Sequence, residues 1–324
     1  MAMIEIMGVR HVYELTNPTS FPHTLVFIHG WLLSRDYWQL LIERLAPNYQ
    51  CLAYDLRGFG QSWCNRVLSS YKNCDNLNQS FLDVDSGNVT ASSYSPSAYA
   101  EDLALLLEKL NIDSAWLVGH SLGGTIALWG ASQMPERVKG VICINAGGGI
   151  YIKEAFEQFR SAGQKVLKFR PRWLCQVPLI DLVFSRANVE QAIARSWGRQ
   201  RVIDFVVADR EAALGALLDF TTEAEINRLP QVVSQIKQPV YFLAGAKDKQ
   251  MEPKYVRHLA SFHPLFQGCG DNVIEIPDCG HMAMLEQPDI VATQIQIILE
   301  QQTRDAGEQG SRGAEGQRGR GENH

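Results

Sequence analysis

The segment Gly119–Gly123 has the residue types of a catalytic turn. Its order, Gly-His-Ser-Leu-Gly, places Ser121 between an apolar run that ends at Val118 and a helical stretch that begins at Gly124. A serine on a sharp strand-to-helix turn needs small neighbours, because the backbone is strained and the helix packs close to the strand. Such a turn exposes the hydroxyl and points the first backbone N–H groups of the helix at the group under attack. We therefore predict that Ser121 is a catalytic nucleophile.

A serine hydroxyl is a weak nucleophile until a base removes its proton. Among the eight histidines, His281 follows the last strand-like run, lies in a loop after Gly280 and precedes the final helix. His120 is adjacent to Ser121, but on the wrong side of the turn to act on it. We predict that His281 is the general base, with a structural histidine as the alternative.

A catalytic histidine works best when a carboxylate fixes its tautomer. Asp248 follows the apolar run Val240–Ala244 after three intervening residues, Gly245–Lys247. It therefore lies at the strand end where open α/β sheets collect their functional groups. The alternative is that Asp248 only caps the next helix. Asp278, close to His281 in the sequence, is the weaker substitute. We predict that Asp248 orients His281.

Two backbone N–H groups are candidates for an oxyanion hole. The stretch His29–Trp31 follows the run Thr24–Ile28, so the Trp31 N–H can face the developing negative charge. The second donor is the N–H of Leu122, directly after the nucleophile. The Trp31 indole can pack against the wall of the site at the same time, because only its backbone is needed.

Apolar strand-like runs alternate with helical patterns, which predicts a mainly parallel sheet with right-handed crossovers. The predicted strands are Thr24–Ile28, Gln50–Tyr54, Ala115–Val118, Gly140–Ile144, Val240–Ala244 and Val273–Ile276. The predicted helices include Tyr37–Leu45, Pro96–Leu110 and Gly123–Gln133, and Ser95 can cap the second of these.

Composition divides the chain into a core and three other regions. We predict a core of residues 1–146 and 239–302, a polar inserted loop at 62–95, a helical cap at 147–238 and a disordered tail at 303–324. Within the loop, Asp83–Gly87 is similar to a calcium loop, but its glycine is one position early and no glutamate follows. We expect no metal there.

The overall charge and the cysteines limit the partners and the compartment. A net charge of −5 argues against nucleic acid as the main partner. Seven scattered cysteines without a C-x-x-C pair fit reduced thiols. No signal peptide or transmembrane segment is evident, so we predict a cytoplasmic protein with a small-molecule substrate. The oligomeric state is left open.

Five landmarks occur in the order typical of one enzyme superfamily: His29–Trp31, Asp55–Ser62, Gly119–Gly124, Gly245–Asp248 and Gly280–His281. The chain resembles the α/β-hydrolase superfamily over about residues 20–300, and the order Ser121, Asp248, His281 is the order of that family. The resemblance implies a sheet of about eight strands, a helical cap after the sixth strand, and neither a metal nor an organic cofactor. It also implies that Asp55–Ser62 is structural, so Arg57 is not catalytic.

Serine at position 121 argues against the haloalkane dehalogenase and epoxide hydrolase branches, which need a carboxylate nucleophile. We expect hydrolysis of a carboxylic ester with a small or moderately apolar substrate, through an acyl-enzyme. Alternatives that stay open are C–C hydrolysis of a dienone acid, cofactor-free perhydrolysis, thioester or lactone cleavage, and a non-catalytic ligand receptor. The Asp55–Ser62 stretch also looks like that of perhydrolases.

The predicted cap is basic, in contrast to the rest of the chain. Residues 151–201 contain ten Lys and Arg and four Asp and Glu, a local net charge of +6. Such a surface would attract anionic substrates or lipid headgroups, including peripheral contact with a membrane. The alternative is an ordinary solvated surface balanced by nearby acids.

Overall fold

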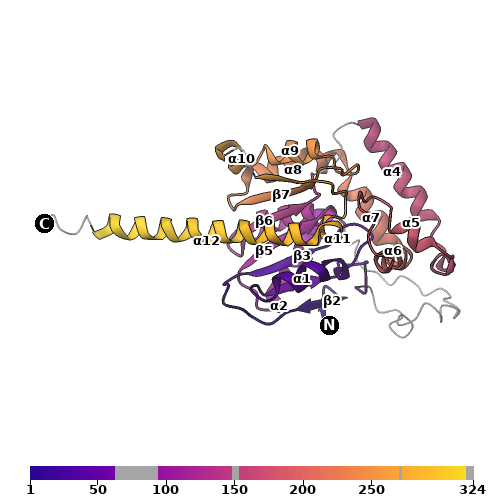
Figure 1. Cartoon of the computed structure of the whole chain (residues 1–324), viewed down its shortest axis with the longest axis horizontal. Helices are drawn as coiled ribbons and strands as arrows, with labels where there is room; N and C mark the ends of the chain where they lie inside the picture. Colours follow the sequence, from indigo (N-terminus) through magenta and orange to yellow (C-terminus); the bar gives the residue numbers. More distant parts are fainter. Residues whose placement is uncertain (63–93, 148–152, 270–271, 319–324) are drawn as a thin grey trace.

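The computed structural model describes residues 1–62, 94–147, 153–269 and 272–318. One eight-stranded sheet has the strand order β1-β2-β4-β3-β5-β6-β7-β8 (Figure 1). Six strands run parallel: β3 (Thr24–Ile28), β4 (Cys51–Tyr54), β5 (Ala115–His120), β6 (Val138–Ile144), β7 (Val240–Gly245) and β8 (Val273–Ile276). The mainly parallel sheet of about eight strands is confirmed, and each predicted strand lies within two residues of an observed one.

The other two strands, β1 (Ala2–Ile6) and β2 (Val9–Leu15), form an antiparallel hairpin that the sequence reading did not predict. Most of their residues are exposed or half-buried, and polar residues interrupt the apolar ones, so no continuous apolar run marks them. The turn between them uses Met7 and Gly8, both at positive φ, as two-residue hairpins require. The glycine at this turn was the sequence feature that could have indicated the hairpin.

Alternate side chains of the parallel strands enter two apolar clusters, one on each face of the sheet. On one face, Val26 and Leu117 pack with α2 (Pro96–Lys109), α3 (Leu122–Gln133), α8 (Glu223–Gln235) and α9 (Pro253–Ala260). On the other, Phe27 and Val118 pack with η1 (Arg35–Trp38), α1 (Gln39–Leu45), α11 (Ala283–Glu286) and the start of α12 (Pro288–Arg318). Helices on both faces hold the strand ends in fixed positions.

The described part of the segment between β6 and β7 is helical, as predicted. It contains α4 (Lys153–Lys168), η3 (Arg172–Gln176), α5 (Ile180–Phe184), α6 (Arg195–Val207), α7 (Arg210–Phe220) and α8. Figure 1 shows α4 to α7 gathered at one end of the molecule, beyond the sheet. The last helix, α8, instead packs against α3, and the Trp129 indole donates to Glu225 across that contact at 2.6 Å.

The helix α12 continues to Arg318, so residues 303–318 are helical where we expected no regular structure. The extension contains no proline to end the helix, and its Glu, Gln, Ala and Arg residues favour a helix, while its four glycines disfavour one. One further short helix, α10 (Pro264–Cys269), lies between α9 and β8 in the chain. Most of the predicted 62–95 loop, including Asp83–Gly87, lies outside the described residues. Among the residues described, no helix is long and apolar enough to cross a membrane.

Candidate active site

Ser121 lies between β5 and α3 with φ 53° and ψ −119°, a conformation that is strained for a residue with a Cβ. Its N–H donates to the Ile144 carbonyl at the end of β6 (3.0 Å), which ties the turn to the neighbouring strand. A Cβ at Gly119 would lie 2.2 Å from the Gly123 oxygen, and one at Gly123 would lie 2.1 Å from the Ile28 oxygen. The strand, turn and helix expected from the sequence are therefore present, and both glycines are sterically required.

Asp248 and His281 are in direct contact at the same edge of the sheet. The His281 Nδ1 lies 2.7 Å from the Asp248 Oδ2, and both side chains are buried. The other carboxylate oxygen accepts the N–H groups of Gln250 (2.8 Å) and Met251 (3.0 Å). Asp278, the weaker alternative, is exposed. The structure thus pairs His281 with Asp248.

Burial alone would raise the pKa of Asp248, but the charge and hydrogen bond of His281, with the surrounding N–H donors, lower it to about 2. Asp248 is therefore ionised at neutral pH and accepts from the Nδ1–H of His281. That tautomer leaves the His281 Nε2 with a lone pair, which is the arrangement a general base needs.

This lowered pKa predicts an acid-sensitive contribution to stability. Because the carboxyl has a lower pKa when folded than the ordinary 3.8, it stabilises the fold above about pH 4, and that contribution is lost as the pH falls toward 2. The shift corresponds to about 2 kcal/mol. We expect the free energy of unfolding in urea to fall less between pH 6 and pH 2.5 in Asp248→Asn than in the wild type. Asp278→Asn, an exposed matched control, should behave like the wild type.

Ser121 follows β5 and His281 lies in the loop after β8, with β6 and β7 between these two strands in the sheet. In the described part of the chain no hydrogen bond joins the Ser121 hydroxyl to His281. The two residues are linked instead through His120, whose Nε2 donates to the His281 carbonyl at 2.7 Å. Burial, with the nearby His281, lowers the pKa of His120 to about 3, so it stays neutral. His120 is thus a support for the His281 loop, consistent with its exclusion as the base.

Asn145, directly after β6, is a site residue whose role sequence reasoning missed. Its Nδ2 donates to the Asp248 Oδ2 (2.7 Å) and to the Gly280 carbonyl (3.0 Å). Its positive φ of 49° turns the side chain out of the strand direction. Asn145 therefore holds the acid and the histidine loop together. An asparagine at a strand end after an apolar run was the available signal.

Glu286, at the end of α11, is a second residue that was missed. Its Oε2 accepts the N–H groups of Gly280 (2.9 Å), Glu190 (2.7 Å) and Gln191 (3.0 Å), while Oε1 accepts that of Met282 (3.0 Å). One carboxylate thereby accepts hydrogen bonds from the residues on both sides of His281 and links them to the segment between β6 and β7. The backbone N–H of His281 itself donates to the Asn188 carbonyl of that segment at 3.0 Å.

We expect Glu286→Gln to lower the free energy of unfolding by about 1–3 kcal/mol, because the amide NH₂ cannot accept and leaves at least one buried N–H unpaired. Urea denaturation at neutral pH measures this loss. Glu275→Gln is the matched control, since Glu275 pairs with Arg257 on the exposed surface. Equal stability of the two variants would refute the stabilising role that we assign to the Glu286 carboxylate.

The two predicted oxyanion donors follow adjacent strands of the sheet. Trp31 follows β3 and Leu122 is the first residue of α3, after β5; these two strands are paired. Neither backbone N–H donates to a protein acceptor in the described residues. The Trp31 indole N–H donates to the Ala213 carbonyl of α7 (2.9 Å), which fixes the loop against the inserted helices. The oxyanion hole formed by these two amides stays a prediction.

The residues Arg57 and Asp55 have structural partners. The Arg57 Nε donates to Asp102 at 2.9 Å, and its guanidinium packs over the rings of Tyr94 and Tyr99. Asp55 pairs with the buried Arg35 at 2.6 Å. These contacts agree with the interpretation that this segment supports the fold. Among the described residues, no group of three or more His, Cys, Asp and Glu side chains could hold a metal ion.

A family model for the alpha/beta hydrolase fold matches residues 23–288. The chain therefore belongs to the α/β-hydrolase family, and by class it is a hydrolase enzyme.

Two curated relatives and one solved structure illustrate the range of that family. An uncharacterized hydrolase, YugF, from Bacillus subtilis is 24% identical over 297 residues, covering 89% of this chain and 93% of the relative. A 2-succinyl-6-hydroxy-2,4-cyclohexadiene-1-carboxylate synthase from Enterobacter sp. is 28% identical over 286 residues, covering 87% and 93%. The structure of a thermophilic esterase from Thermogutta terrifontis has a TM-score of 0.67 at 21% identity, covering 93% and 99%. At that identity the esterase shows the fold alone.

Proposed function

We propose that the protein hydrolyses carboxylic esters of small or moderately apolar substrates through an acyl-enzyme. As the Ser121 Oγ bonds to the ester carbon, the His281 Nε2 takes the hydroxyl proton, and Asp248 stabilises the resulting imidazolium. The carbonyl oxygen gains the electron pair and accepts from the N–H groups of Trp31 and Leu122. His281 then returns the proton to the departing alcohol oxygen.

A water molecule then hydrolyses the acyl-enzyme by the same series of steps. His281 removes a proton from the water as its oxygen bonds to the acyl carbon, and the proton passes to the Ser121 Oγ as that bond breaks. The products are a carboxylic acid and an alcohol, and the free enzyme is restored. The proposal needs no metal or organic cofactor.

The observation that carries the proposal is the buried Asp248–His281 pair, together with a serine in a strained turn whose neighbour His120 bonds the His281 carbonyl. The missing hydrogen bond from Ser121 to His281 is compatible with it, because catalytic hydrogen bonds often tighten only when substrate binds. The buried thiols of Cys51, Cys143 and Cys279 support our proposal of a cytoplasmic location.

The proposed function is tested by a fluorophosphonate probe and a panel of p-nitrophenyl esters of increasing acyl length. We expect covalent labelling at Ser121, located by peptide mass spectrometry, and turnover of at least one ester. Labelling elsewhere, or turnover without labelling, would refute the nucleophile assignment. Labelling without measurable turnover across esters, thioesters and lactones would favour a ligand receptor.

A second candidate is suggested by the 28% identical synthase from Enterobacter sp., whose named product is a cyclohexadiene carboxylate. In that case Ser121, His281 and Asp248 would act together as a base on a carbon acid, and no acyl-enzyme would form. Trapping an acylated Ser121 with a slowly deacylating ester separates the two. An acyl adduct supports ester hydrolysis, whereas conversion of a dienone acid without an adduct supports the second candidate.

A further inference from the structure

Exposed apolar side chains are concentrated in one short stretch of the inserted helices. Of the eleven large apolar side chains exposed in the described part of the chain, five lie between residues 166 and 183. They are Val166 (49% exposed), Phe169 (68%), Trp173 (55%), Leu179 (61%) and Val183 (62%). Single exposed apolar residues are ordinary, but this density marks an interaction surface. We refer to the exposed surface of residues 165–186 as the 165–186 face.

These side chains are not core residues of an incompletely packed helix. In the last turns of α4, Leu167 is buried, and a Cβ at Gly163 would lie 2.7 Å from Leu217 of α7. The helix therefore already has a partner on that side. Val166 is 49% exposed beside this contact, and Phe169, just past the helix end, packs edge-to-face on Trp173 with ring centroids 6.2 Å apart. The pair forms an exposed aromatic cluster between α4 and α5, two helices at the end of the molecule beyond the sheet (Figure 1).

Basic residues are interleaved with the apolar ones. Lys165, Lys168, Arg172 and Arg186 are all exposed on the 165–186 face. The acid within the same stretch, Asp181, is already paired with Arg195 at 2.8 Å. Residues 151–201 carry +6 while the whole chain carries −5, so the remainder carries −11. The positive charge is thus concentrated in residues 151–201.

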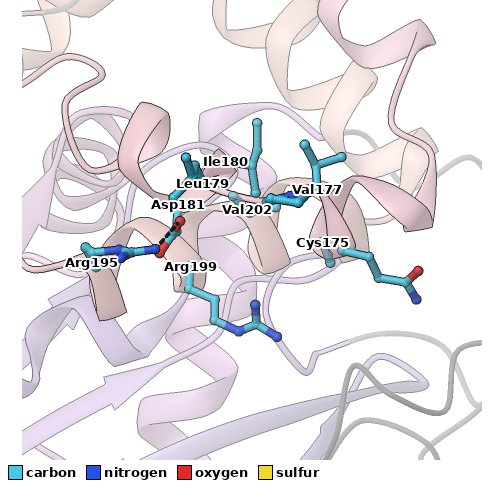
Figure 2. A pocket seen from close by; sticks show the side chains of 10 residues that line it. Cys175, Val177, Leu179, Ile180, Asp181, Arg195, Arg199 and Val202 are labelled. Carbon is cyan, nitrogen blue, oxygen red and sulfur yellow. Dashed lines mark hydrogen bonds and ion pairs between the residues drawn. The ribbon is translucent and has the colours of Figure 1, made fainter.

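A hollow of about 380 Å³ adjoins this face, between η3, α5 and α6 (Figure 2). Val177, Leu179 and Ile180 contribute apolar wall, and Figure 2 shows Asp181 engaged with Arg195. Arg199 is exposed at the same hollow and is not engaged by Asp181. An apolar wall beside the exposed guanidinium of Arg199 suits the boundary between lipid chains and an anionic headgroup.

We propose that the 165–186 face docks the protein onto the surface of a bilayer that contains anionic phospholipid. The basic side chains are attracted to the headgroups, while Phe169, Trp173 and their neighbours enter the boundary between headgroups and chains. A tryptophan is suited to that position because one side of its ring system is polar. No catalytic residue takes part, so the proposal stands apart from the proposed function.

The test is vesicle co-sedimentation of the full chain with phosphatidylcholine alone and with phosphatidylcholine mixed with phosphatidylglycerol. We expect partition to the anionic vesicles at least about tenfold above the neutral ones, and a decline as ionic strength rises. Binding should also shift Trp emission to shorter wavelength. That shift should shrink in Trp173→Phe while sedimentation with the vesicles is largely kept.

Point variants separate the two contributions. Lys168→Gln should weaken partition about fivefold, since each cation near an anionic surface contributes about 1 kcal/mol. Phe169→Glu should weaken it at least about tenfold, because an anion replaces an inserted ring. The matched controls are Met3→Glu on β1 and Ile297→Glu on α12, which replace exposed apolar residues elsewhere. Both controls should bind as the wild type does, and all variants should keep the wild-type circular dichroism spectrum.

Three results would overturn the proposal. The first is equal partition to neutral and anionic vesicles, or none to either. The second is loss of binding in Ile297→Glu equal to that in Phe169→Glu. The third is a concentration-dependent dimer in sedimentation velocity that Phe169→Glu abolishes, without vesicle binding, which would assign the face to a second copy of the chain.

Discussion

Replacing Ser121 with alanine is expected to lower kcat for a turned-over p-nitrophenyl ester by about 10⁴- to 10⁶-fold. In the proposed mechanism the Ser121 hydroxyl oxygen is the atom that forms the acyl bond, and alanine has no atom that can replace it. Residual turnover would come from the Trp31 and Leu122 amides acting on a water molecule. Steady-state kinetics with purified protein, together with loss of fluorophosphonate labelling, measures the effect.

Ser234→Ala is the matched control, because Ser234 is exposed on α8 and bonds only its own helix, at the Gln231 carbonyl. It should retain wild-type kcat and labelling. Ser121→Ala should fold as the wild type does, because alanine also carries a Cβ and so leaves the backbone strain at this turn unchanged. Retained turnover in Ser121→Ala would exclude Ser121 as the nucleophile and with it the acyl-enzyme.

Replacing His281 with alanine is expected to cost nearly as much as loss of the serine. Without the imidazole, neither the hydroxyl proton nor the leaving alkoxide has a partner for transfer. The loss should be non-additive: the double variant Ser121→Ala, His281→Ala should be about as slow as either single variant, because the two groups act in one step. An additive loss would mean that they act separately.

His258→Ala serves as the control for a histidine removed elsewhere, since His258 is exposed on α9. Asp248→Asn should retain more activity than His281→Ala, because His281 keeps its place but loses control of its tautomer. The order of severity is therefore Ser121, His281, Asp248. A reversal of the last two would indicate that Asp248, rather than His281, contacts the reacting atoms.

Much of the candidate site could be predicted from the sequence because the chemistry lies at strand ends. An apolar run followed by small or polar residues marks where a parallel strand leaves the sheet, and the carboxyl ends of parallel strands meet at one edge. That reasoning located the turn around Ser121 and selected Asp248 over Asp278 before any contact was known. It missed β1 and β2, whose half-exposed edge positions lack a continuous apolar run.

What holds those groups in place was decided by the tertiary structure alone. Asn145 meets Asp248 across 103 residues, Glu286 meets Glu190 across 96, and His120 meets the His281 carbonyl across 161. No local spacing encodes such pairs, because each depends on which strands become neighbours and how the inserted helices return to the core. The sequence by itself determined the reactive residue types and the strand ends that carry them. Packing determined their support, since a buried N–H or carboxylate finds its partner only after distant segments have come together.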